Sequence, residues 1–307
     1  MKRQVALAVV TVMTATLSAG VIAGASISSA PRTAPPITMY YLSLGDSYAT
    51  GYQPGYADNS ETLDGFPDQL NVKLAADLVP MTLENFACGR ATTDSVMNRI
   101  GCTHLALNSP TYPTTTQAQA VLDFIATHPG QIGLITVALA FNDFNRCSNF
   151  VRSCVISTMR RAHTQRNSAR LTNQLRAAVG PSVPILAVTY PDVFLGDWLG
   201  STHDRQVAAR SATMFRTVIN PLFARAYAHA KVVLVDVTAD TNAYVPTTLQ
   251  VNLNPYGSIP ESVAQVCTLT WFCQRHDVHP QTAGYTAIAT LLEQAYLKSL
   301  TSSQSQS

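Results

Sequence analysis

Four short polar clusters contain the residue types that nucleophilic attack on an ester requires. They read GDSYATG from Gly45, NFACGRAT from Asn85, AFND from Ala140 and HDVHP from His276. The first cluster supplies the hydroxyl of Ser47, which is a weak nucleophile until an adjacent base removes its proton. His279 in the last cluster is the natural base, because the unperturbed pKa of histidine lies near neutrality.

The two middle clusters offer groups that could stabilise negative charge. Acyl transfer needs hydrogen-bond donors aimed at the oxyanion that forms on the attacked carbonyl. We expect three such donors, which are the backbone N–H of Ser47, the backbone N–H of Gly89 and the side-chain amide of Asn142. Gly89 has no side chain that would block a close approach. Asp46 in the first cluster and Asp143 in the third are expected to hold turns through backbone bonds.

Apolar runs just before these clusters predict the strands that would bring them together. We expect strands at 39–44, 83–87, 134–140, 183–188 and 232–237, and helices at 66–78, 118–127, 159–179, 204–228 and 282–300. Strands that alternate with helices indicate a parallel sheet covered on both faces. The predicted fold class is therefore α/β, a flavodoxin-like three-layer α/β/α sandwich with about five parallel strands. Sites in such sheets lie at the carboxyl ends of the strands, where the first three clusters stand.

The four clusters together resemble those of the SGNH (GDSL) hydrolase family, in which Ser, Gly, Asn and His occur in this chain order. The matching residues are Ser47, Gly89, Asn142 and His279, and the resemblance extends from Tyr40 to about Ala289. It implies the SGNH hydrolase fold, with Ser47 as the nucleophile and His279 as the general base. It also implies that Ser47, Gly89 and Asn142 form the oxyanion hole. The cysteine arrangement is similar to that of the secreted three-disulfide esterase and lipase branch.

Two positions depart from the family pattern. Ala140 stands where the third block usually has glycine, so a positive φ there would strain the backbone. His276 stands where the family has its catalytic aspartate, and Asp277 follows one residue later. We favour a Ser–His dyad in which the carbonyl of His276 orients His279. Asp277 as the acid, or an aspartate elsewhere in the chain, are the alternatives.

The N-terminus predicts export. Lys2 and Arg3 precede an apolar stretch that ends in small residues, which is typical of a secretory signal peptide over 1–30. A retained membrane anchor is the alternative. A Pro-rich linker (31–38), the hydrolase domain (39–300) and a flexible tail (301–307) are expected to follow. Removing the two basic residues would leave 18 basic and 18 acidic side chains, which argues against a nucleic-acid binder.

The six cysteines are expected to form disulfides in an exported protein. Six cysteines allow 15 connectivities, but here they fall into three close pairs along the chain. We predict the bridges Cys88–Cys102, Cys147–Cys154 and Cys267–Cys273. A zinc site is the alternative, but the sequence has no CxxC pair. No metal or cofactor is expected.

The segment from Phe144 to Tyr190 contains no acidic residue. It is either a solvated helix face or a weak contact for an anionic surface, and it carries seven arginines: Arg146, Arg152, Arg160, Arg161, Arg166, Arg170 and Arg176. Phe141 is the best candidate for a wall of the acyl pocket. No coiled-coil or repeat pattern is present, so we expect a monomer.

The sequence thus predicts a secreted serine ester hydrolase, a lipase or esterase of carboxylic esters that works through an acyl-enzyme on Ser47. One alternative is a carbohydrate O-acetyl esterase. The other is a secreted binding protein of the same fold without catalysis. The expected partner is a lipid or small acyl ester.

Overall fold

The structure is a computed structural model that describes residues 38–55, 61–147 and 149–304. The predicted signal peptide (1–30) lies outside the described residues, as does all of the predicted linker except Thr38.

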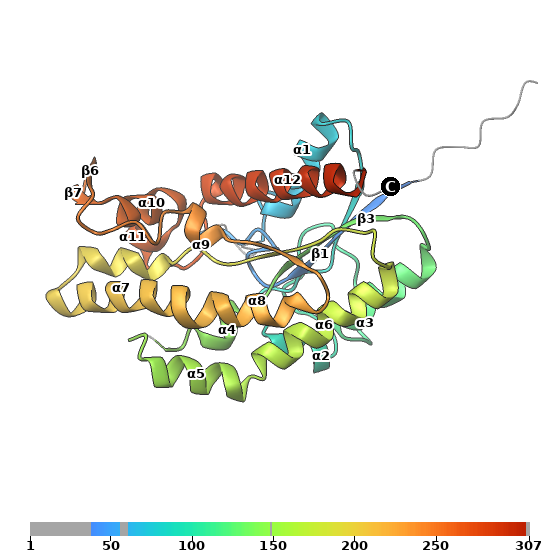
Figure 1. Ribbon diagram of the computed structural model, residues 1–307, viewed down its shortest axis with the longest axis horizontal. Coiled ribbons are helices and arrows are strands. Elements are labelled where there is room, and N and C mark those ends of the chain that lie inside the picture. The colour runs from blue at the N-terminus through green and yellow to red at the C-terminus, as the bar shows by residue number, and fades with distance from the viewer. Residues whose placement is uncertain (1–37, 56–60, 148, 305–307) are drawn as a thin grey trace, which may run out of the picture. The chain divides into compact units, whose positions relative to one another are not determined.

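A five-stranded parallel sheet forms the centre of the described chain (Figure 1). Its strands are β1 (Tyr40–Gly45), β2 (Thr82–Asn85), β3 (Ile132–Ala138), β4 (Ile185–Val188) and β5 (Val233–Val235), in the order β2-β1-β3-β4-β5. All four pairings are parallel. Each strand overlaps a predicted one, so the predicted α/β class and five-stranded parallel sheet are confirmed.

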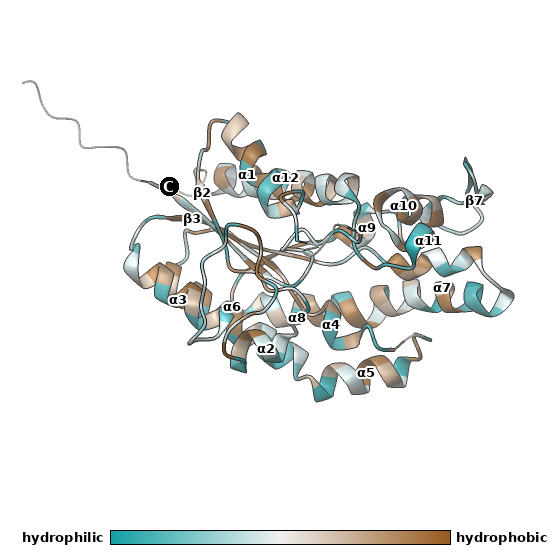
Figure 2. Ribbon diagram, turned by 180° about the vertical axis from the view of Figure 1, so that it is seen from behind, coloured by the Kyte–Doolittle hydropathy of each residue, from teal (hydrophilic) through white to brown (hydrophobic). Residues whose placement is uncertain are grey.

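Helices cover both faces of this sheet. Helices α1 (Phe66–Ala76) and α12 (Thr282–Gln304) lie on one side, and α3 (Gln117–Thr127), α6 (Thr164–Val179) and α8 (Asn220–Ala228) lie on the other (Figure 1). Almost every residue of β1 and all of β4 are therefore buried, which explains why these strands read as continuous apolar runs. Figure 2 shows the hydrophobic colouring along the strands between the helical layers.

Short elements complete the chain at the ends of the strands. The ones before β4 are α2 (Thr93–Asn98), α4 (Phe141–Phe144) and α5 (Arg152–Arg161); those after it are η1 (Val193–Leu199), α7 (Thr202–Met214), η2 (Phe215–Ile219), α9 (Val237–Asp240), α10 (Glu261–Leu269) and α11 (Phe272–Arg275). A small antiparallel hairpin of β6 (Gln250–Leu253) and β7 (Gly257–Pro260) was not predicted from the sequence.

Three helix predictions need correction. The helix expected at 159–179 is two helices, α5 and α6, because His163 adopts a left-handed conformation (φ 53°) between them. The helix expected at 204–228 begins at Thr202 and contains a π-helical turn, η2, between α7 and α8. The last helix continues to Gln304, so the predicted tail (301–307) overlaps its final turn.

All three predicted disulfides are present. Cys88–Cys102 closes the loop after β2, Cys147–Cys154 ties the segment after α4 to α5, and Cys267–Cys273 joins α10 to α11. Each bridge therefore closes a short loop, with sequence separations of 14, 7 and 6. Within the described part of the chain, no helix is long and apolar enough to cross a membrane.

Candidate active site

The nucleophile candidate stands on a turn that only glycine permits. Gly45, the last residue of β1, has a φ of 150°, and a Cβ there would lie 2.1 Å from the carbonyl oxygen of Ala138 on β3. This close approach requires glycine and directs the chain into Ser47. On the other side, the amide of Asn85 donates to the carbonyl of Ala49 at 2.9 Å. Ser47 is thus braced by both neighbouring strands.

Asp46 stabilises the same turn through hydrogen bonds, as the sequence suggested. One carboxyl oxygen accepts the backbone N–H of Tyr48 at 3.0 Å, and the other accepts the hydroxyl of Tyr190 at 2.7 Å. The group is fully buried, and burial raises its pKa to about 7 although both hydrogen bonds lower it. Asp46 contacts neither His279 nor the cleft, so its part is structural.

Ser47, His279 and Asp277 form one continuous hydrogen-bonded chain. The hydroxyl oxygen of Ser47 lies 2.7 Å from Nε2 of His279, and Nδ1 of His279 lies 2.7 Å from Oδ1 of Asp277. The same carboxylate oxygen accepts the backbone N–H of His279 at 2.9 Å. Burial alone would raise the pKa of Asp277, but its hydrogen bonds and charge interaction with His279 lower it below the ordinary value. An ionised Asp277 accepts the proton on Nδ1, which leaves Nε2 free to accept from Ser47.

In this geometry the group at Nδ1 of His279 is the carboxylate of Asp277, the alternative to the favoured dyad. His276 adopts a left-handed conformation (φ 53°), and its ring lies against Phe272, with 4.8 Å between the ring centroids. The turn that follows brings the carboxylate of Asp277, rather than the carbonyl of His276, to Nδ1 of His279.

Three aromatic residues hold the loop that carries His279. The hydroxyl of Tyr48 donates to the carbonyl of Val278 at 2.6 Å, and the backbone N–H of Trp271 donates to the carbonyl of His279 at 2.9 Å. The ring of Tyr52 lies against the imidazole, with 4.1 Å between centroids. These contacts fix the imidazole between Ser47 and Asp277.

Gly89 does not offer the expected oxyanion donor. Its N–H donates to the carbonyl of His104 at 2.7 Å, so in this structure the group is not free to bind an oxyanion. Glycine is nevertheless required, because a Cβ there would lie 2.9 Å from Cβ of His104 and 3.2 Å from Oε1 of Glu61. The next residue, Arg90, adopts a positive φ of 67°. Its N–H makes no hydrogen bond with any described residue, and the same is true of Ser47.

Asn142 lies where the sequence placed it, on a strained turn. Ala140 has a φ of 99°, a backbone conformation that residues other than glycine rarely adopt. The amide of Asn142 donates one hydrogen to the carbonyl of Ala91 at 2.9 Å, and its oxygen accepts from Asn145 at 3.1 Å. Because an amide has two hydrogens, one remains for a substrate. These two hydrogen bonds hold Asn142 at the site, despite the strained backbone at Ala140.

Asp143 fastens this turn to two other helices. Its carboxyl group accepts the N–H of Thr93 at 3.0 Å and the hydroxyl of Thr164 at 2.6 Å. These residues begin α2 and α6. Burial raises the pKa of Asp143, while the three hydrogen bonds from the two threonines lower it. The geometry around Asp143, like that around Asp46, agrees with a structural role.

Ser47, Asn142 and His279 open into one cleft of about 460 Å³. Phe141 belongs to its lining, as predicted, and Val278 is the other fully apolar member. Apart from Gly89, the rest of the lining has polar or aromatic side chains: Tyr52, Glu61, Arg90, Thr103, His104 and Asn145. The cleft therefore has a short apolar wall and a polar rim.

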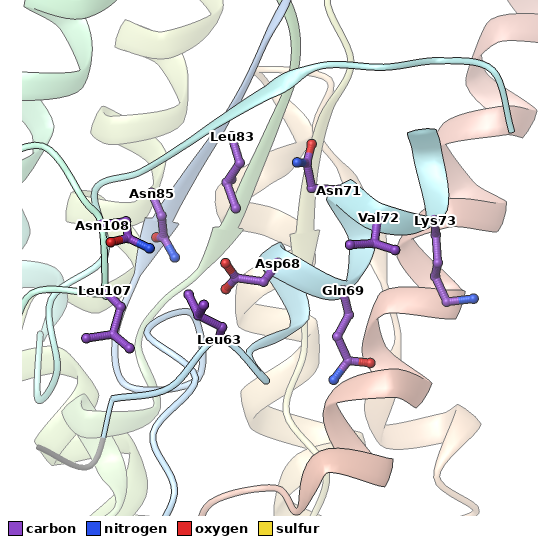
Figure 3. Close-up of a pocket in the computed structure, with 10 residues that line it drawn as sticks. All are labelled: Leu63, Asp68, Gln69, Asn71, Val72, Lys73, Leu83, Asn85, Leu107 and Asn108. Atoms are coloured by element: carbon purple, nitrogen blue, oxygen red, sulfur yellow. The ribbon is translucent and has the colours of Figure 1, made fainter. Parts of the chain in front are cut away.

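A separate hollow of about 570 Å³ lies between α1 and the edge strand β2 (Figure 3). The carboxyl group of Asp68 points into it from α1, and burial raises the pKa of that group to about 7. The lining contains no serine, cysteine or histidine, so this hollow offers no nucleophile–base pair. Among the described residues, no group of three or more His, Cys, Asp or Glu side chains could hold a metal ion.

The sequence matches a known protein family over most of its length. The model of the GDSL-like lipase/acylhydrolase family matches residues 43–287. No curated protein sequence matches the chain.

Solved structures with a similar fold include three bacterial enzymes. The extracellular lipase of Streptomyces rimosus is 15% identical, with a TM-score of 0.49 over 84% of this chain and 100% of its own. A phospholipase A1 of Streptomyces albidoflavus is 16% identical, with a TM-score of 0.47 over 84% of this chain and 99% of its own. A carbohydrate acetylesterase family member of Sinorhizobium meliloti is 16% identical, with a TM-score of 0.45 over 86% of this chain and 99% of its own.

Proposed function

The chain belongs to the GDSL-like lipase/acylhydrolase family, and we propose that it is an exported serine hydrolase of carboxylic esters. The observation that carries this proposal is the 2.7 Å contact between the hydroxyl of Ser47 and Nε2 of His279. A serine within hydrogen-bond reach of a base that a third group orients is the arrangement that activates a hydroxyl nucleophile.

In the proposed first step, Oγ of Ser47 attacks the ester carbonyl while Nε2 of His279 accepts the hydroxyl proton. Asp277 stabilises the imidazolium that forms, through the bond to Nδ1. The N–H groups of Ser47 and Arg90 and the second amide hydrogen of Asn142 hold the oxyanion. Each such donor typically contributes roughly 10²–10³-fold to the rate.

The proton then moves from His279 to the departing alcohol, and an acyl-enzyme remains on Ser47. Water repeats the cycle, giving its proton to His279 and its oxygen to the acyl group. Ser47 is regenerated as the acid leaves. One ester and one water thus become one acid and one alcohol, and none of these steps uses a metal or cofactor.

The cleft also supports a second candidate, an O-acetyl esterase of carbohydrates. Its rim carries hydrogen-bonding side chains from Glu61, Thr103 and His104, which could bind the hydroxyls of a polar alcohol. The two fully apolar members of its lining, Phe141 and Val278, would suit a short acyl group. A cleft with few apolar residues is a poor site for a long acyl chain.

Export is proposed from the basic and apolar N-terminal pattern together with the three disulfides, since disulfides persist in oxidising compartments. Sequencing the N-terminus of the protein recovered from the culture medium would test it. A chain retained in the cells with residues 1–30 intact would contradict it.

The catalytic proposal is tested by ester turnover. Purified protein is assayed on p-nitrophenyl acetate and p-nitrophenyl octanoate, with Ser47→Ala and the exposed Ser153→Ala as a matched control. We expect turnover by wild type and Ser153→Ala, and a loss of at least 10³-fold in Ser47→Ala. Hydrolysis of acetate but not octanoate would favour the acetyl esterase. Absence of turnover on both esters by a folded wild-type protein would favour a binding protein without catalysis.

A further inference from the structure

A groove between α5, α6, η2 and α8 collects arginines that the catalytic account does not use. Its volume is about 610 Å³, which is within the range of about 300–1,000 Å³ typical of small-molecule sites. Arg152 and Arg160 reach it from α5, Arg166 from α6 and Arg225 from α8. Arg225 lies outside the Arg-rich segment seen in the sequence, so the fold enlarges that cluster.

The four arginines have no partners among the described residues. Their side chains form no hydrogen bond or ion pair with a described residue, and all four are exposed. The four elements that form the groove contain no aspartate or glutamate. The positive charge of the rim is therefore not neutralised within this part of the protein.

The floor of the groove is apolar. Ile156 and Met159 contribute from α5, Ala169 from α6, Val218 from η2 and Leu222 from α8. Ile156, Ala169 and Leu222 are only partly buried, so apolar surface is open to a ligand. A solvated helix face needs no such floor, and a free polyanion would gain nothing from it.

The local backbone is irregular where the groove forms. The break between α5 and α6 at His163 lets the two helices diverge, and His163 itself lines the groove. Thr217 and Val218 belong to the π-helical turn η2, a feature that often accompanies functional sites. Helix α5 lies at the outer edge of the fold in both views (Figures 1 and 2), where a surface could reach it.

We propose that this groove binds an anionic phospholipid at a membrane surface, with the phosphate held by the arginines and part of one acyl chain on the apolar floor. Charge complementarity selects the headgroup, and the open floor selects a lipid over a soluble phosphate. Arginine suits this position, because its guanidinium group pairs with phosphate while its stem packs on apolar surface. The inference is independent of the catalytic proposal.

The test is co-sedimentation of the full chain with vesicles of ether-linked lipids, which contain no ester to hydrolyse. Binding to phosphatidylglycerol but not to phosphatidylcholine is expected. It should weaken between 50 and 300 mM salt, because the screening length shortens roughly 2.4-fold over that range. Arg160→Gln/Arg166→Gln should lower partitioning about 30-fold, since each basic residue near an anionic surface contributes roughly fivefold.

Arg146→Gln/Arg170→Gln is the matched control, because both residues are exposed and lie in the same acid-free segment but outside the groove. This control should stay within about threefold of wild type, in line with charges that do not face the lipid. Thermal unfolding verifies that both variants are folded. Equal losses in the two double variants, or no binding to phosphatidylglycerol, would overturn the proposal. Competition by glycerol phosphate as strong as that by dodecyl phosphate would also overturn it, because the floor would then bind nothing.

Discussion

Removing the carboxylate of Asp277 should slow catalysis far more than the sequence alone suggested. This oxygen accepts two hydrogen bonds from His279, at 2.7 Å from Nδ1 and at 2.9 Å from the backbone N–H. Hydrogen bonds to a charged group contribute about 1.5–3 kcal/mol each. Losing both as the imidazolium forms would cost about 3–6 kcal/mol, or roughly 10²–10⁴-fold in kcat/KM. Asp277→Ala is expected in that range.

Asp277→Asn distinguishes orientation from charge. An asparagine amide can donate to Nδ1, which would place the imidazole proton on Nε2 and prevent His279 from accepting the proton of Ser47. We therefore expect a loss near 10⁴-fold, the effect of a wrong tautomer in a serine triad.

The assay for both variants is kcat/KM on p-nitrophenyl acetate, with the exposed Asp240→Asn as the control for loss of a negative charge. If Asp277→Ala keeps more than a third of wild-type activity, Asp277 does not act through His279. The carbonyl of His276 would then be the candidate for the group that orients His279.

Three further predictions concern stability. At Ala140, glycine would relieve about 1–3 kcal/mol of backbone strain but lose a methyl contact and chain entropy of about 1–2 kcal/mol. By denaturant unfolding, the stability of Ala140→Gly should thus lie between about 1 kcal/mol below and about 2 kcal/mol above that of wild type, and a larger loss would show that the positive φ is not strained. Burial raises the pKa of Asp192 to about 8, although hydrogen bonds from Ser211 and Phe194 lower it. The folded state therefore keeps a proton that the unfolded chain releases near pH 4, and stability falls as pH rises from about 4 to 8. Asp192→Asn should flatten that slope in unfolding curves at pH 5 and pH 8, whereas an unchanged slope would assign it to other groups. Cys88→Ser/Cys102→Ser opens a loop with a sequence separation of 14 and should lower the unfolding free energy by about 3 kcal/mol; no change in the denaturation midpoint would refute this.

The central sheet was predictable because burial on both faces leaves a direct mark on the sequence. The strands around Leu42, Ile135 and Leu186 read as apolar runs, and the polar clusters follow them at one edge of the sheet. Ser47 and Asn142 could be placed on the same ground, whereas His279 was identified from the fourth cluster, which precedes the last helix. The three disulfides were predictable because their cysteines are close in sequence.

The finer geometry depends on contacts between distant residues. The acceptor that occupies the N–H of Gly89 comes from His104, and no local pattern shows which of two successive N–H groups faces the cleft. The left-handed residues His163 and His276 end helices without a glycine or proline to mark them. For this reason the helix break was missed, and Asp277 was only an alternative to the carbonyl of His276.

The claim that Ser47 is the nucleophile is tested most directly by labelling with a fluorophosphonate, followed by peptide mapping. We expect one adduct on the peptide that contains Ser47, present in wild type and Ser153→Ala and absent in Ser47→Ala. An adduct that persists in Ser47→Ala, or a folded wild-type protein that forms none, would contradict the account.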